Sequence, residues 1–286
     1  MAEVRPIKIR YPAFRRFDAA RIEANNAMVG LLIGTRLSAH LLDSHAGALV
    51  LLPQIYPQVR GVDLLNRTVA DAQTQISLSE AHLSTMAIPF LQSVFEDLAT
   101  ETARLCGLRG FAPLPSERGQ GLEGTLVFLE RCSRSEFSAV HRHLFTFLRH
   151  IRNQIIHGGS MSSALLDTEW SGLPADAKAR WVAVARRPYQ MGGDASGRIV
   201  LEAPELTAAL AIGKRMAVEV SGHLGRVLLD RDWAEVVADD YDATVRPLTR
   251  RSTLVRELRS FARREYGPVQ PTDASLKAAV AARGLA

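Results

Sequence analysis

The amino-acid sequence predicts an all-α protein: an up-and-down helical bundle with a small β-hairpin insertion and additional helices at both ends. Three observations support this fold class. Apolar residues recur along most of the chain at the three- and four-residue spacing of one helix face. Segments rich in glycine and proline separate these periodic stretches. Hydrophobic residues make up 47% of the 286 residues, which is enough to bury a sizeable core.

The first predicted helix covers residues 18–46. Residues 6–12, with a proline at either end, precede it as an extended lead-in. Gly34 lies inside the helical pattern and predicts a break or bend there. A loop follows at residues 53–61, which contain two prolines and end in a glycine. The first long helix therefore ends before this loop.

The second long helix is predicted at residues 77–106, with Ser79 as its N-cap and a kink at Pro89. Its apolar stripe faces the core and consists of Leu83, Met86, Phe90, Leu91, Val94, Phe95, Leu98 and Leu105. A connection rich in glycine and proline spans residues 107–121. Residues 122–131 then predict a short helix.

The next predicted helix, residues 135–157, carries the most informative residues of the chain. Its core face consists of Val140, Leu144, Phe147, Leu148, Ile151 and Ile155. The opposite face is polar and collects His143, Thr146, Arg149, His150, Asn153 and His157. Arg152 lies on the flank between the two faces. Gly158 and Gly159 suit a left-handed C-terminal cap, so His157 falls in the last turn.

Beyond these two glycines the pattern changes. Residues 181–187 and 198–203 predict short strands, and the glycine-rich residues 189–197 between them predict a turn, so we expect a β-hairpin here. Residues 204–229 then predict a long helix with Pro204 at its first position. The hairpin would be a small appendage on a helical body.

Two shorter helices, at residues 252–266 and 274–283, complete the predicted order of elements. We expect three parts, namely an N-terminal helical extension at 1–70, a helical bundle at 71–235 that contains the insertion 159–203, and a basic C-terminal helical segment at 236–286. Since each periodic stretch needs a partner to cover its apolar face, the middle part is the predicted core.

Positive charge is concentrated in residues 244–270. This segment contains seven arginines and two glutamates, which accounts for the whole formal net charge of +5. One interpretation is nucleic-acid contact through phosphates, with Arg250 and Arg251 as candidate RNA-binding residues. The other is an amphipathic helix that packs its apolar side on the body of the protein through Leu254, Leu258 and Phe261.

Several classes of protein are disfavoured by the sequence. The longest apolar runs, residues 28–33 and 46–52, are far shorter than the roughly 20 residues that span a bilayer. Residues 1–10 are basic but lack a following apolar signal region. Cys106 and Cys132 have no metal-binding spacing, so we expect a cytoplasmic location. No phosphate-cradling or dinucleotide motif occurs, and we expect neither cofactor nor metal.

The helix at 135–157 resembles a known family. Arg152-Asn153, three further residues, then His157-Gly158 is similar to the signature of the HEPN superfamily, in which an arginine precedes a histidine by four to six residues. The order of elements from Ser77 to Arg231 also resembles HEPN four-helix bundles: a long helix, a short helix, the motif helix, an irregular insertion and a final long helix.

This resemblance implies a homodimer that cleaves RNA without a metal. His157 would act on the 2′-hydroxyl or the leaving oxygen, Arg152 would stabilise charge on the scissile phosphate, and Asn153 would orient or hydrogen bond. These roles suit the residue types, because histidine titrates near neutral pH and arginine is a permanent cation. Arg149 and His150, on the same polar face, are candidate RNA-binding residues.

A dimer also solves a geometric difficulty. In one helix the side chains of Arg152 and His157 point roughly 140° apart, so they diverge. A symmetric dimer can place two copies of each around one cleft. The resemblance further implies a toxin or antiviral-defence effector, with an antitoxin or another defence protein as a possible partner.

One departure from the family pattern concerns regulation. A large subset of HEPN toxins has a tyrosine two residues after the motif histidine, whereas this chain has Gly159. Nucleotidylation of such a tyrosine is therefore in doubt. Some HEPN families add an acidic residue from an earlier helix, and Glu96 and Glu101 are both candidates for that role.

Structural roles are the alternative for each motif residue. His157 can hydrogen bond a last-turn carbonyl near the helix dipole, Arg152 can extend its stem along the apolar flank, and Asn153 can satisfy neighbouring backbone. A metal shared by His143, His150 and His157 is excluded, because seven residues of helix rise roughly 10.5 Å. The competing functional class is a non-catalytic HEPN-like scaffold or a nucleotide- or RNA-binding module.

Overall fold

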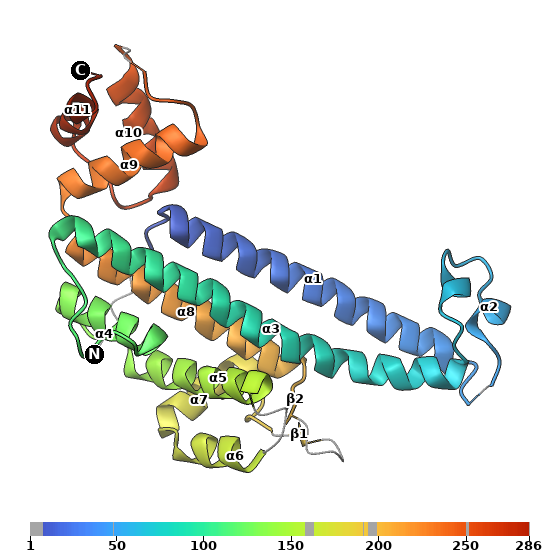
Figure 1. Cartoon of the computed structure of the whole chain (residues 1–286). Coiled ribbons are helices and arrows are strands. Elements are labelled where there is room, and N and C mark those ends of the chain that lie inside the picture. The colour runs from blue at the N-terminus through green and yellow to red at the C-terminus, as the bar shows by residue number, and fades with distance from the viewer. Residues whose placement is uncertain are drawn as a thin grey trace. The chain divides into compact units, whose positions relative to one another are not determined.

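The computed structural model describes residues 8–47, 49–157, 163–190, 192–193, 199–249 and 252–285. Nearly all regular structure in these ranges is helical, so the predicted all-α class is confirmed (Figure 1). The chain forms two compact units: unit 1 comprises Met1–Ala20, Gln92–Phe145 and Ala211–Ala286, and unit 2 comprises Arg21–Leu91 and Thr146–Leu210. The predicted three-part division remains a prediction, and its boundary at residue 235 falls within a helix.

Four long helices contribute residues to both units, namely α1 (Pro12–Asp43), α3 (Val69–Cys106), α5 (Ala139–His157) and α8 (Ala203–Val227). Each has the apolar periodicity that the sequence shows, but several predictions about them were wrong. Helix α1 begins six residues earlier than predicted and is continuous through Gly34, where a break or bend was predicted. Helix α3 begins eight residues earlier than predicted, because the hydroxyl of Thr68 accepts the backbone N–H of Asp71 at 3.1 Å and caps its first turn.

Unit 1 contains an aromatic core and a three-helix group. Phe95 and Phe145 lie with ring centroids 4.3 Å apart, and Phe17 packs against Phe95 at 6.1 Å. Helix α4 (Gly121–Ser133) follows the connection after α3. The C-terminal group consists of α9 (Asp230–Thr244), α10 (Leu254–Glu265) and α11 (Asp273–Ala282), which pack on one another (Figure 1).

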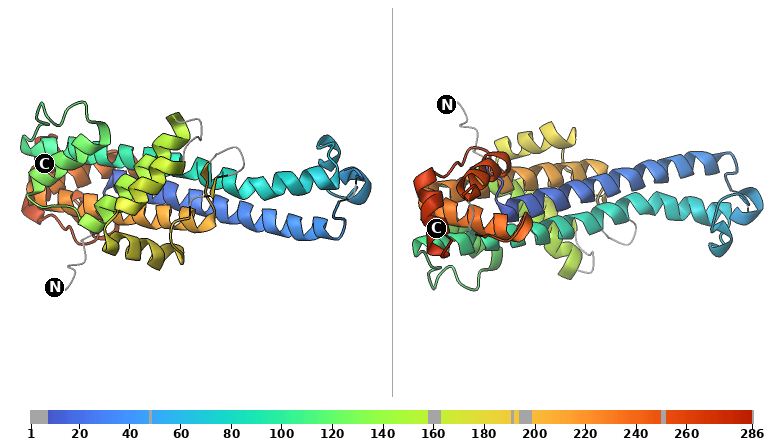
Figure 2. Two further views of the ribbon diagram at one scale, coloured as in Figure 1. Left: turned by 90° about the horizontal axis from the view of Figure 1, so that it is seen from below. Right: turned by 90° about the horizontal axis from the view of Figure 1, so that it is seen from above.

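In unit 2, residues 21–43 of α1 and 69–91 of α3 lie side by side in every view (Figures 1 and 2). The segment that joins them includes α2 (Leu52–Ile55) and the 3-10 turn η1 (Val62–Leu64). A small core between these elements consists of Leu42, Leu52, Val62, Val69 and Ala72. The hydroxyl of Tyr56 donates to the carbonyl of Leu41 at 3.0 Å and ties the segment to α1.

The second part of unit 2 differs from the prediction. Residues 181–187 were predicted as a strand, but they include the end of helix α7 (Ala175–Ala185), which follows α6 (Ser163–Gly172). The strand predicted at 198–203 is also wrong in extent, because only β2 (Ile199–Val200) is extended, pairing antiparallel with β1 (Gly192–Gly193). Trp181 accounts for the difference, because its side chain is fully buried in an aromatic cluster when this segment is helical.

Candidate functional site

Helix α5 begins at Ala139, four residues later than predicted, because its first turn is capped from a distant part of the chain. One carboxylate oxygen of Glu219 on α8 accepts the backbone N–H of Ser138 at 2.8 Å. The other lies 2.5 Å from Nδ1 of the buried His141. This carboxylate satisfies a backbone donor at the positive end of the helix dipole. The start of α5 is therefore fixed within unit 1.

An aromatic cluster supports the second half of α5 within unit 2. Phe147 packs against Trp170, Trp181 and Tyr189, with ring centroids 4.9 to 5.9 Å away. Phe147 and Trp181 are almost fully buried, and burial raises the pKa of the Tyr189 hydroxyl. Leu144, Leu148 and Ile151 are also fully buried, so these residues of the predicted core face are confirmed, whereas Val140 and Ile155 are only partly buried. One side of α5 is thus anchored and the other is left for the motif.

The motif residues occupy the free side and end of this helix. Asn153 and His157 are exposed and lie four residues apart, which places them on one face. Arg152 is partly exposed, and its Nη1 donates to the side-chain oxygen of Asn153 at 3.0 Å. Within the described residues, no partner from another element holds any of the three side chains. Their hydrogen-bonding groups therefore do not hold elements of the fold together.

The candidate RNA-binding residues have different surroundings. Arg149 and His150 are both partly exposed. Nδ1 of His150 lies 3.2 Å from a carboxylate oxygen of Glu169 on α6, close enough for an ion pair but not aligned as a hydrogen bond. A carboxylate at this position repels phosphate while it remains there. Arg250 and Arg251, and the cap residues Gly158 and Gly159, lie outside the described residues.

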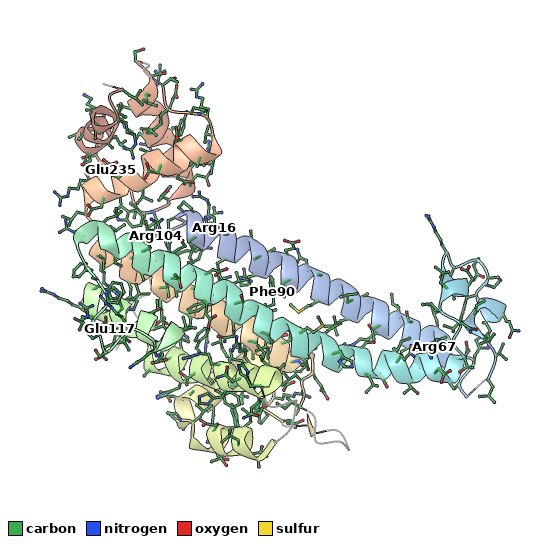
Figure 3. All side chains as sticks on the ribbon, in the orientation of Figure 1. Arg16, Arg67, Phe90, Arg104, Glu117 and Glu235 are labelled. Carbon is green, nitrogen blue, oxygen red and sulfur yellow. The ribbon has the colours of Figure 1, made fainter. Side chains whose placement is uncertain are left out.

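The two candidate acids belong to unit 1. Glu96 is partly exposed on α3. Glu101, one turn further, forms an ion pair with Arg104 at 3.0 Å, on the stretch of α3 where Figure 3 labels Arg104. The pair is local, between residues three apart on one helix, and both side chains are largely solvated. These contacts do not indicate which of the two acids would assist the motif.

Unit 1 also contains buried polar pairs that sequence patterns did not reveal. Oγ of Ser133 lies 2.6 Å from Nδ1 of His223, which stacks on Phe137 and is 1% exposed. Burial and the nearby cations Arg226 and Arg142 lower the pKa of His223 to about 4. A histidine closed to solvent with such a low pKa is a weak base, so this pair is structural. Sequence spacing could not predict this pair, because its two residues are 90 residues apart.

Three arginines of the C-terminal segment are paired with acidic neighbours. Arg246 donates to Glu257 at 2.6 Å, Arg264 donates to Glu265 at 2.8 Å, and Arg259 pairs with Asp273. Hydrogen bonds from Thr253, Arg246 and Tyr241 lower the pKa of Glu257 to about 2. The packing interpretation of this segment is confirmed by the buried side chains Leu254, Leu258 and Phe261. Contact with nucleic acid stays a prediction.

Comparison of the chain with protein-family models, with characterised proteins and with solved structures finds no match. Across the described ranges, no helix is both long and apolar enough to cross a membrane. The same ranges contain no group of three or more histidine, cysteine or acidic side chains arranged to hold a metal ion. Function is therefore inferred from the residues of the site themselves.

Proposed function

We propose that this protein is a metal-independent endoribonuclease of the HEPN type, acting as a homodimer in the cytoplasm. The observation that carries the proposal is that Asn153 and His157 are exposed at the end of α5, and that the partly exposed Arg152 donates to Asn153. These three side chains have the residue types and spacing of the HEPN motif.

The chemistry follows from the residues. The 2′-oxygen of a ribose attacks the adjacent phosphorus, the bond from phosphorus to the 5′-oxygen breaks, and the products are a 2′,3′-cyclic phosphate and a 5′-hydroxyl. His157 removes the proton from the 2′-hydroxyl or supplies one to the leaving oxygen. Arg152 stabilises the charge that develops on the phosphate, and Asn153 orients the guanidinium through the bond described above. The nucleophile belongs to the substrate.

A composite site between two copies of α5 accounts for the divergence of the side chains. Five residues of helix separate Arg152 from His157, a rise of roughly 7.5 Å and a turn of about 140°. Two such helices across a two-fold axis supply two arginines and two histidines to one cleft. Each substrate phosphate then meets an arginine of one copy and a histidine of the other.

The finer description of the fold belongs to the same proposal. We place a HEPN-like bundle at residues 71–235, interrupted by an insertion at 159–203 that contains a small β-hairpin. The antiparallel pairing of β1 with β2 supports the hairpin. The biological role that suits such an enzyme is a toxin or an antiviral-defence effector, held in check by an antitoxin or a defence-system partner.

A mixing experiment tests the composite site. Arg152→Ala and His157→Ala are each expected to be inactive alone on RNA in the presence of a chelator. Mixed and allowed to exchange subunits, they are expected to regain activity, because the heterodimer keeps one arginine and one histidine. His82→Ala, which removes an exposed histidine of α3, is the matched control and should cut like the parent. Activity in either single variant equal to the parent would reject the proposal.

The second candidate function is a non-catalytic HEPN-like module that binds RNA or a nucleotide or serves as a scaffold. The observation in its favour is Glu169, whose carboxylate lies beside His150 and opposes a phosphate on that part of the face. This alternative predicts binding without cleavage. A filter-binding measurement with labelled RNA, run alongside the cleavage assay, separates the two functions.

A further inference from the structure

The outer surface of α1 carries large apolar side chains that stay about half exposed. They lie within unit 2 and are 45 to 59% exposed: Ile22, Val29, Leu31, Ile33, Leu37 and Leu41. Single exposed apolar residues are ordinary, but five of these six, all except Leu31, fall along one side of the helix and make a continuous patch. On α3, Met86 is 74% exposed, and Phe90, labelled in Figure 3, is 46% exposed.

These residues are additional to those that pack α1 inside the chain. Met28 is 7% exposed and Leu42 is 5% exposed, so they form the inward side of the helix. The α1 segment is therefore apolar on more than one side. Helices of this composition are normally covered on more than one side.

The surface carries few charges, although charged residues make up 23% of the chain. Residues 24–35 contain none, the exposed Glu23 and Arg36 flank this stretch, and on α3 residues 72–95 contain only Glu80. An uncharged surface does not attract nucleic acid, which is bound through cations. It does suit contact with an identical surface, because a two-fold contact brings like residues close to one another and like charges would repel.

The surface shape of α1 is complementary to that of a second copy of the same helix. Val29, Ile33, Leu37 and Leu41 follow one another at four-residue spacing and form a ridge. The adjacent row consists of small or short side chains: Asn26, Gly30, Gly34 and Ser38. A Cβ atom built on either glycine would meet nothing within 4 Å, so the glycines relieve no crowding inside the chain. Glycine weakens a helix relative to alanine, and within this chain nothing offsets that loss.

We propose that a second copy of this chain packs on α1 between Ile22 and Leu41. The ridge of each copy lies in the row of small residues of the other, which is the packing of helix ridges into grooves. Gly30 and Gly34 let the two backbones approach closely. The contact is isologous, so one surface serves both copies.

The available area matches a moderate interface. Twenty residues of helix are roughly 30 Å long and about 10 Å across, so half of that cylinder presents on the order of 500 Å² per copy. Exposed side chains of α3 add to this. Stable interfaces bury about 800 Å² per partner, so the α1 contact is expected to be weak enough to dissociate on dilution.

Light scattering of the purified chain over a concentration series tests the proposal. The parent is expected to show an assembly larger than the α5 dimer of the proposed enzyme, and this assembly should dissociate on dilution. Ile33→Arg should weaken the α1 contact at least ten-fold, because the guanidinium would be buried against the partner. Gly34→Leu should do the same without lowering the melting temperature of the dilute chain, since a Cβ atom at Gly34 meets nothing within 4 Å. Leu165→Arg, at a leucine of α6 that is 49% exposed, is the matched control and should leave the α1 contact intact.

The proposal is independent of the enzymatic activity, and its failure is recognisable separately. His157→Ala should keep the α1 contact even though it cuts no RNA. A parent that is monomeric at tens of micromolar, or an assembly whose mass neither α1 variant lowers, would overturn the proposal. So would a monomer that sediments with phosphatidylcholine vesicles and loses this binding in Ile33→Arg, because lipid would then be what covers the patch.

Discussion

The polar side chains of unit 1 and those at the end of α5 in unit 2 are of similar types. Those of unit 1 bind partners from other elements, whereas those at the end of α5 do not. In unit 1, Glu219 meets His141, and Arg15 donates from Nη2 to both oxygens of Asp240 at 2.7 Å. His141 and Asp240 are buried, Glu219 and Arg15 are partly buried, and each has a partner far away in the sequence. Around His157, within the described ranges, no side chain from another element is bound.

The difference indicates where stability and where function reside. Removing one member of a buried pair leaves a charge or donor without a partner, so the fold is weakened. Removing an exposed group that holds nothing leaves the fold unchanged, so any loss must appear in activity. Substitutions in the two regions should therefore give opposite results, and four measurements examine this.

The largest effect is expected at the motif. His157→Ala and Arg152→Ala should each lower the rate of RNA cleavage by about 10² to 10⁴-fold, the range typical of losing a general acid or base or a charge stabiliser. Stability should change by no more than about 0.5 kcal/mol, because both side chains are at the surface. Single-turnover kinetics and thermal melts of the same preparations measure the two quantities. A large loss of stability in either variant would contradict the expected difference between unit 1 and the end of α5.

At the buried pair the expectation is reversed. Arg15→Ala leaves the carboxylate of Asp240, which is 1% exposed, without its cation. The hydroxyl of Tyr266 then remains as a hydrogen-bond donor to it. We expect about 3 to 5 kcal/mol of destabilisation in urea unfolding, with cleavage by the folded fraction unaffected. Arg104→Ala is the control, because its pair with Glu101 is exposed and should contribute less than about 1 kcal/mol. Equal effects of the two substitutions would contradict the account.

Trp181 tests whether the support beneath the motif behaves like the buried region. It is fully buried against Phe147, Trp170 and Tyr189. Trp181→Ala should cost about 3 to 5 kcal/mol of unfolding free energy, and Trp181→Phe clearly less, because the cavity is smaller. Calorimetry of both variants measures this. A neutral Trp181→Ala would mean that the cluster does not hold α5.

The smallest expected effect is a pH dependence of stability from His223. Its pKa is about 4 in the folded chain and 6.5 in the reference state, so the unfolded chain binds the extra proton between these values. The contribution is complete above pH 6.5 and is lost as pH falls toward 4. The loss is about 3 kcal/mol at most. His223→Gln should flatten the unfolding free energy across this window, and an unchanged slope would assign the pH dependence to other groups.

Local patterns in the sequence were sufficient to predict much of the helical fold. The apolar side of α5, with Leu148 and Ile151 buried, followed from spacing alone. The end of α5 beyond residue 157 lies outside the described ranges. Its start was placed four residues too early, because the cap is Glu219 and no local rule identifies a partner 81 residues away.

Two kinds of feature were missed for physical reasons. The end of α7 was predicted as a strand because Trp181, Val182 and Val184 have high strand propensity, but tertiary packing in the aromatic cluster overrides propensity. The buried pairs, such as Ser133 with His223, were invisible because each residue has many ordinary roles and only the fold brings them together. The motif could be recognised because its residues lie on a single helix.

Cleavage of total RNA by the purified parent in excess chelator is the decisive measurement for the α5 motif. We expect fragments with 2′,3′-cyclic phosphate and 5′-hydroxyl ends that appear with the parent and with His82→Ala but not with His157→Ala. Intact RNA under all conditions, or fragments that His157→Ala produces equally well, would contradict the assignment of the α5 motif as a ribonuclease site.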